Sequence, residues 1–124
     1  DILLNALKTA GYYLCMETNG LNAAPTQINF VATSPKACYA DKYAKSCIEK
    51  ADEVRIVADG DVLAFCEQIE RKIQAKHFYL SPCEQNGVMN IYDTIRQIGL
   101  LNSRTHATVH WQLSVQTHKW AGIE

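Results

Sequence analysis

The stretch Val54-Arg55-Ile56-Val57-Ala58 decides the fold together with the segment that follows it. It is a short, mostly apolar run, which predicts a buried strand. Residues 61–76 then predict a helix, because apolar side chains recur at helical spacing with charges opposite them, at Val62, Cys66, Ile69 and Ile73. His77-Phe78-Tyr79-Leu80 predicts the next strand. A strand, a helix and a strand in succession form a βαβ unit, which builds a parallel sheet.

The same alternation extends on both sides of this unit. Further strands are expected at residues 12–16, 28–33 and 108–115. A further helix is expected at residues 2–10, with Gly11 after its end. Another is expected at residues 41–48, with Asp41 as the cap and with Tyr43, Ala44, Cys47 and Ile48 on the inner side. A third is expected from Asn90 to Gly99, bearing Ile91, Ile95 and Ile98. The sequence therefore predicts one α/β domain over residues 1–124 with a mainly parallel sheet.

One connection is short for a parallel sheet. The segment from Glu17 to Ile28 has too few residues for a full crossover helix, and Asn19-Gly20 would suit a hairpin turn instead. We expect a parallel pair with a shortened crossover. A complete (β/α)₈ barrel takes about 250 residues. Five strands in 124 residues therefore predict a partial (β/α) barrel or an open sheet, with one free edge that favours dimerisation.

Composition narrows the function classes. The net charge is −1, and the twelve Lys and Arg residues form no basic stripe, so we expect no direct contact with nucleic acid. No apolar run approaches a membrane span. The five cysteines are odd in number and form no C-x-x-C pair, which favours reduced thiols and a cytoplasmic protein. The chain begins at Asp1 without Met, directly in an apolar pattern, which suggests a fragment.

Each predicted strand is followed by a polar cluster. Because parallel strands end along one edge of a sheet, where ligands bind, these clusters predict a binding site. The plainer alternative is that loops are polar in any protein. The clusters are Glu17-Thr18-Asn19-Gly20, Ser34-Pro35-Lys36, Asp59-Gly60-Asp61, Ser81-Pro82-Cys83-Glu84 and Gln116-Thr117-His118-Lys119.

Three of these strings, taken in their order along the chain, resemble motifs of a known enzyme superfamily. Glu17-Thr18-Asn19-Gly20 after an apolar strand and Ser34-Pro35-Lys36 after the next strand resemble the radical S-adenosylmethionine (SAM) superfamily. The closing Gln116-Thr117-His118-Lys119 is similar to the 7-carboxy-7-deazaguanine synthase family of queuosine biosynthesis, a tRNA modification pathway. The resemblance covers the C-terminal half of that family's radical SAM barrel.

The resemblance implies a carbon–nitrogen lyase. Such an enzyme converts 6-carboxy-5,6,7,8-tetrahydropterin to 7-carboxy-7-deazaguanine with release of ammonia. It uses a [4Fe-4S] cluster, SAM and Mg²⁺, is typically a homodimer, and takes electrons from an external donor such as flavodoxin. The family's C-x₃-C-x₂-C-like cluster motif and its glycine-rich strand do not occur in these 124 residues. We therefore expect no cluster or magnesium ligands and no catalytic residue in this chain, and an inactive fragment.

The resemblance also implies residue roles. Ser34, Pro35 and Lys36 match the SAM-contacting motif, whereas a plain loop is the alternative. Ser81, Pro82, Cys83 and Glu84 stand where the family has Gln-Pro-Met-x, so only Pro82 matches that second SAM-adjacent turn. The expected substrate-binding residues are Glu17, Gln116, His118 and Glu124. Glu17 has a surface glutamate as its alternative, and Cys83 a simple packing role.

Two other functions stay open at this point. A glycyl-radical-enzyme activase would share the string at Glu17–Gly20 but not the one at Gln116–Lys119. A non-catalytic α/β binding module would need neither.

Overall fold

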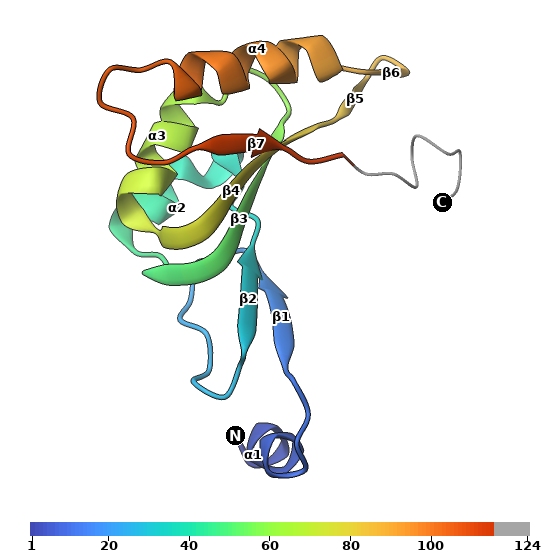
Figure 1. Cartoon of the computed structure of the whole chain (residues 1–124), viewed down its shortest axis with the longest axis vertical. Helices are drawn as coiled ribbons and strands as arrows, with labels where there is room; N and C mark the ends of the chain where they lie inside the picture. The colour runs from blue at the N-terminus through green and yellow to red at the C-terminus, as the bar shows by residue number, and fades with distance from the viewer. Residues whose placement is uncertain (116–124) are drawn as a thin grey trace.

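The structure is a computed structural model that describes residues 1–115, and its centre is a five-stranded sheet (Figure 1). The strand order is β1-β2-β3-β4-β7, and every neighbouring pair is parallel. The strands span Cys15–Thr18 (β1), Phe30–Thr33 (β2), Lys50–Ala58 (β3), Gln74–Pro82 (β4) and Trp111–Leu113 (β7). The predicted α/β class with an open, parallel sheet is therefore confirmed, and the sequential strand order is the one a (β/α) barrel has.

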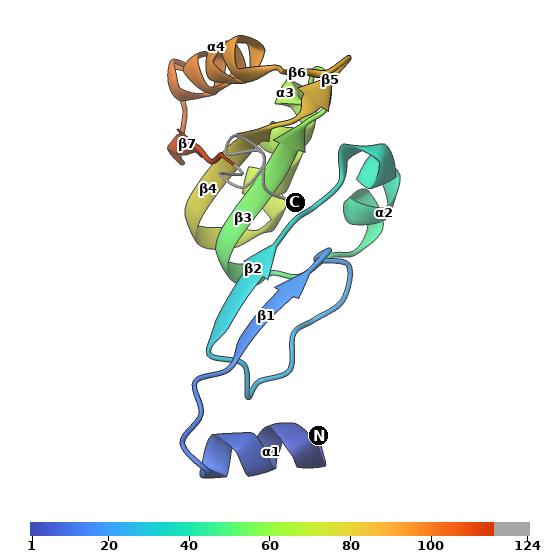
Figure 2. The ribbon, with the colours of Figure 1, turned by 90° about the vertical axis from the view of Figure 1, so that its right-hand side faces the viewer.

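Four helices, a 3₁₀ turn and a small hairpin are the other elements of the described residues. The helices are α1 (Ile2–Thr9), α2 (Ala40–Lys45), α3 (Leu63–Lys72) and α4 (Ile91–Asn102), and a 3₁₀ turn, η1 (Ala37–Tyr39), precedes α2. β5 (Glu84–Gln85) and β6 (Val88–Met89) form an antiparallel pair next to the end of β4. Figure 2 shows α4 at the carboxyl end of the sheet and α1 at the opposite end of the molecule.

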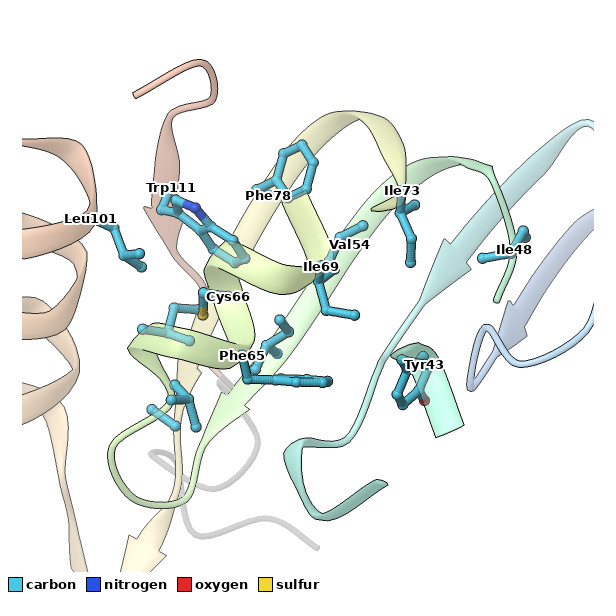
Figure 3. Packing of buried hydrophobic residues seen from close by; sticks show 14 of the residues in the cluster. Tyr43, Ile48, Val54, Phe65, Cys66, Ile69, Ile73, Phe78, Leu101 and Trp111 are labelled. Atoms are coloured by element: carbon cyan, nitrogen blue, oxygen red, sulfur yellow. The ribbon is translucent and has the colours of Figure 1, made fainter. Parts of the chain in front are cut away.

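The core lies between one face of the sheet and helices α2 and α3 (Figure 3). Val54, Ile56 and Ala58 of β3 are buried, as strand alternation requires, while the residues between them face the other side. The predicted helical face of α3 is confirmed, since Val62, Cys66, Ile69 and Ile73 are all buried. Tyr43 of α2 meets Phe65 of α3 edge to face, with ring centroids 5.7 Å apart.

The first connection is a shortened parallel crossover, so the hairpin alternative at Asn19-Gly20 is wrong. β1 and β2 pair in parallel from Cys15↔Phe30 to Thr18↔Thr33, and residues 19–29 between them contain no helix. Gly20 is required in this crossover for two reasons. Its φ of +80° favours glycine, and an added Cβ would lie 2.4 Å from Thr33 Oγ1.

Several predicted boundaries near the N-terminus were wrong. The strand expected at residues 12–16 begins only at Cys15, because Tyr12 and Tyr13 are exposed rather than buried. Asp41 does not cap a helix; it lies inside the first turn of α2, which follows directly from the 3₁₀ turn. Asp1 is a cap instead, since its carboxylate accepts hydrogen bonds from the backbone N–H groups of Leu3 and Leu4.

α4 is longer than predicted, and polar side chains share its buried face. It continues past Gly99 to Asn102, and its buried residues are Thr94, Gln97 and Leu101, while Ile95 is exposed. The reason is a polar inner face. The Gln97 side chain accepts a hydrogen bond from the Val62 N–H and donates one to the Gly60 carbonyl, which satisfies the β3–α3 loop.

β7 is shorter than the predicted strand at residues 108–115. A side chain is hydrogen-bonded to its backbone on the side away from β4. The Asn102 amide accepts from the Trp111 N–H at 2.8 Å and donates to the Trp111 carbonyl at 2.9 Å. On the other side, Trp111 to Leu113 lie opposite Phe78 to Leu80 of β4. Asn102 therefore occupies the backbone groups that a further strand would use at this point. Within residues 1–115, no helix is both long and apolar enough to cross a bilayer.

Candidate functional site at the carboxyl edge of the sheet

The loops after β1 and β2 are joined at the carboxyl edge of the sheet. The Ser34 N–H donates to the Thr18 carbonyl at 2.9 Å, so Ser34-Pro35-Lys36 begins beside the end of β1. Pro35 is buried, whereas Ser34 and Lys36 are exposed. Two of the strings that the sequence singled out therefore lie side by side, with their polar side chains accessible.

Tyr43 of α2 is hydrogen-bonded to both loops. Its side chain is fully buried, and its hydroxyl donates to the Asn19 carbonyl and accepts from the Lys36 N–H. Burial raises the pKa of the Tyr43 phenol, so the hydroxyl stays protonated and available as a donor. The sequence pattern identified Tyr43 as a core residue, but it gave no sign of this bridging role.

A cavity of about 170 Å³ opens next to the Ser34-Pro35-Lys36 string. Its walls are residues 34–38 together with Arg55, Val57 and Asp59 from the carboxyl half of β3 and its following loop. Complete small-molecule sites measure roughly 300–1,000 Å³. The cavity is thus smaller than a complete site of that kind.

One face of the sheet, which no helix of residues 1–115 covers, carries polar side chains that the sequence did not single out. Arg55 Nη2 lies 2.6 Å from Glu53 Oε1, and the Arg55 guanidinium lies over the Tyr79 ring at 5.6 Å from its centroid. Tyr79 in turn stacks on His77, with ring centroids 6.1 Å apart. The signal was present in the alternation of Val54-Arg55-Ile56-Val57, where a charged residue stands between buried ones.

Glu17 lies on this same uncovered face. Glu17 is exposed, and it begins a row of paired residues that runs across four strands. The row continues through Ala32 of β2 and Glu53 of β3 to His77 of β4. Adjacent strands lie about 4.8 Å apart, so the row places Glu17 within reach of a ligand that rests against β2 and β3. The other three expected substrate-binding residues, Gln116, His118 and Glu124, lie outside the described residues.

The Ser81–Glu84 string ends β4 beside the end of β3. Ser81 and Pro82 stand opposite Val57 and Ala58, and both are buried. The Cys83 N–H donates to Asn90 Oδ1 at 2.8 Å, and the Asn90 amide donates to the Ala58 carbonyl at 2.6 Å. Glu84 is exposed in β5. None of the four lines the cavity beside Ser34.

The donor set of the cavity suits a polar or anionic organic ligand better than a metal ion. Ser34 offers a hydroxyl that can meet ribose oxygens, and Lys36 and Arg55 offer cationic donors for a carboxylate. Among residues 1–115, His, Cys, Asp and Glu side chains form no group of three or more that could hold a metal ion. The fold defines a parallel α/β protein, and its candidate ligand site lies at the carboxyl ends of the strands.

Comparison with known proteins specifies that class. The chain is 79% identical over its full length to the 7-carboxy-7-deazaguanine synthase of Neisseria meningitidis and 56% identical to that of Haemophilus influenzae. It is 34% identical over 99% of its length to that of Bacteroides thetaiotaomicron. It spans only 58%, 58% and 57% of these relatives' lengths, and no protein-family model matches it. The chain is thus homologous to somewhat more than half of a 7-carboxy-7-deazaguanine synthase, which confirms the resemblance inferred from its motifs.

Proposed function

We propose that this chain is part of a radical SAM lyase that converts 6-carboxy-5,6,7,8-tetrahydropterin to 7-carboxy-7-deazaguanine in queuosine biosynthesis. The observation that carries the proposal is 79% identity over every residue of the chain to a protein of that name. The arrangement of the carboxyl edge supports it, because the loops after β1 and β2 are tied together around an accessible hydroxyl and ammonium. The activase and the binding-module alternatives gain no support from these relatives.

In this proposal the chain contributes ligand binding. Ser34 hydrogen-bonds ribose hydroxyls of SAM, Lys36 addresses a carboxylate or ribose oxygen, and Pro35 packs beneath them. Glu17 accepts hydrogen bonds from the N–H groups of the pterin. Gln116, His118 and Glu124 remain proposed substrate contacts, and Ser81 to Glu84 a proposed second SAM-adjacent turn.

Bound SAM, together with a reduced [4Fe-4S] cluster, supplies the radical chemistry. The residues of this chain hold the two ligands close together and keep water away. No C-x₃-C-x₂-C-like string occurs in the 124 residues, so we propose that the cluster and Mg²⁺ are bound by other residues of the synthase and that this chain alone is inactive. A cytoplasmic homodimer reduced by a flavodoxin-like donor completes the proposal.

The test compares the full-length protein that carries this sequence with the 124-residue chain. Both are reconstituted anaerobically with iron and sulfide and supplied with SAM, Mg²⁺, reduced flavodoxin and 6-carboxytetrahydropterin. We expect the full-length protein to bind about four irons per subunit and to form 7-carboxy-7-deazaguanine, detected by mass spectrometry, and the chain alone to form none. A full-length protein that takes up iron but forms no product would contradict the proposed substrate, and one that takes up no iron would contradict the radical SAM class.

A further inference from the structure

Arg55 is a cationic residue in the wall of the cavity beside Ser34, and no role in ligand binding has yet been proposed for it. It stands on the uncovered face of β3. Ala32 pairs with Glu53 and Thr33 pairs with Val54. The residues that follow these pairs, Ser34 and Arg55, therefore lie at the same level. The cavity that it lines is the one bordered by residues 34–38. Its side chain is 42% exposed, so a ligand in the cavity can reach it.

The guanidinium of Arg55 is held in place but only partly used. Glu53 Oε1 takes one donor at Nη2, and the ring of Tyr79 supports the plane of the group. Within residues 1–115 the buried Nε has no hydrogen-bond partner, and no hydrogen bond engages Nη1. A guanidinium carries five N–H donors in a fixed fork that matches a carboxylate. An arginine fixed at its stem, with donors to spare and facing a cavity, is preorganised for an anion.

The charges around the cavity are balanced. Lys36 and Arg55 line it as cations, and Asp59 is the single carboxylate in its wall. Glu53 pairs with Arg55 from outside the wall, with 18% of its side chain exposed. With Glu53 counted, two cations face two carboxylates. A ligand carboxylate would therefore be held by the unused guanidinium donors of Arg55 and not by an excess of positive charge.

We propose that Arg55, oriented by Glu53 and Tyr79, is a carboxylate-binding residue of this site. The inference rests on the proposed function for the identity of the ligand. Two ligands of that reaction carry one carboxylate each, namely the methionyl end of SAM and the 6-carboxypterin, and the chemistry that Arg55 recognises is common to both. Glu53 and Tyr79 are positioning residues in this arrangement, since they act through Arg55.

The test measures equilibrium binding to the full-length, reconstituted protein and its Arg55→Gln variant. The probes are SAM against 5′-methylthioadenosine, and 6-carboxytetrahydropterin against tetrahydropterin without the carboxylate. Loss of a charge-assisted fork weakens binding by about tenfold or more. We expect such a loss of affinity for one carboxylate-bearing probe only, while the affinity for its carboxylate-free partner stays unchanged. The probe that loses affinity identifies the carboxylate that Arg55 binds.

Controls separate binding from folding. Arg71→Gln removes an exposed arginine from the last turn of α3 and is expected to leave all four affinities unchanged. Arg55→Lys is expected to recover part of the lost affinity, since it keeps the charge without the fork. Glu53→Gln combined with Arg55→Gln avoids an uncompensated carboxylate and is expected to show the same selective loss if Arg55→Gln is unstable.

The inference is overturned if both carboxylate probes bind the Arg55 variants within twofold of the unaltered protein. It is also overturned if the carboxylate-free probes lose as much affinity as their partners. When the unaltered protein forms product, these results remove only the role of Arg55. If the unaltered protein binds neither SAM nor the pterin, the proposed function fails as well.

Discussion

The indole Nε1 of Trp111 donates to Glu70 Oε2 at 2.9 Å, and this hydrogen bond joins strand β7 to helix α3. The same carboxylate receives a two-point contact from Arg104 at 2.6 and 3.0 Å, which raises the pKa of that guanidinium. Only 6% of the Glu70 side chain is exposed. One buried carboxylate therefore connects α3, β7 and the loop after α4.

Glu70→Gln is expected to lower the free energy of unfolding. Breaking a buried pair costs about 3–5 kcal/mol, but Arg104 is 27% exposed and keeps water as a partner, so we expect about 2 kcal/mol. The measurement is urea denaturation of the full-length protein. Glu67→Gln is the matched control, because Glu67 lies 3.6 Å from the same Arg104 on the surface and is 40% exposed. Equal losses for the two variants would argue against a special role of the buried carboxylate.

Tyr43→Phe is expected to loosen the two loops at the carboxyl edge. The change leaves the Asn19 carbonyl and the Lys36 N–H without their shared partner, which costs about 1–3 kcal/mol. Because these loops carry the proposed SAM contacts, we also expect weaker SAM binding, measured by equilibrium dialysis. Tyr39→Phe, in an exposed tyrosine that stacks with Lys42, serves as the control. Unchanged SAM affinity in Tyr43→Phe would show that the bridge does not set the site.

Gly20→Ala is expected to be strongly destabilising, because strain at φ +80° adds to a 2.4 Å contact with Thr33 Oγ1. Gly11→Ala isolates the strain, since Gly11 has φ +88° and open space around it, and we expect about 1 kcal/mol there. Gly20→Ala is expected to cost at least 1 kcal/mol more. Thr33→Ala in the same chain removes the clashing oxygen and is expected to restore part of the loss. Thermal unfolding gives these values, and no rescue by Thr33→Ala would refute the steric explanation.

Cysteine reactivity is expected to follow burial. Desolvation raises the pKa of the Cys66 thiol to about 12, so at pH 8 it remains protonated and unreactive. Cys15 and Cys38 are exposed. Alkylation of the folded chain with iodoacetamide, followed by peptide mass spectrometry, is expected to label Cys15 and Cys38 well before Cys66. Labelling of Cys66 at a similar rate would mean that α3 opens readily.

The sequence predicted the central βαβ unit because its helix and strands bury apolar side chains with clean periodicity, as at Val62, Cys66 and Ile69. The same periodicity did not predict the buried polar residues of α4, because Thr94 and Gln97 are buried for their hydrogen bonds, and apolar spacing cannot detect polar contacts. The first strand was misplaced because exposed tyrosines resemble buried ones in sequence.

The candidate site was predicted only in its loops. Ser34-Pro35-Lys36 stood out because it follows a strand and matches a known string. Arg55 did not stand out, because it lies within a strand and not in a loop that follows one. Tyr43 was expected in the core, but its bridge from Asn19 to Lys36 depends on packing between distant segments.

The side-chain amide of Asn102 makes the two margins of the sheet unequal. At Trp111 this amide imitates a neighbouring strand and ends the hydrogen-bond ladder, so an incoming segment finds no free donor and acceptor there. β1, at the other margin, pairs with β2 alone among the described residues. Among the described residues, a further strand would therefore find the backbone groups of Trp111 occupied, whereas Cys15–Thr18 has a strand on one side only.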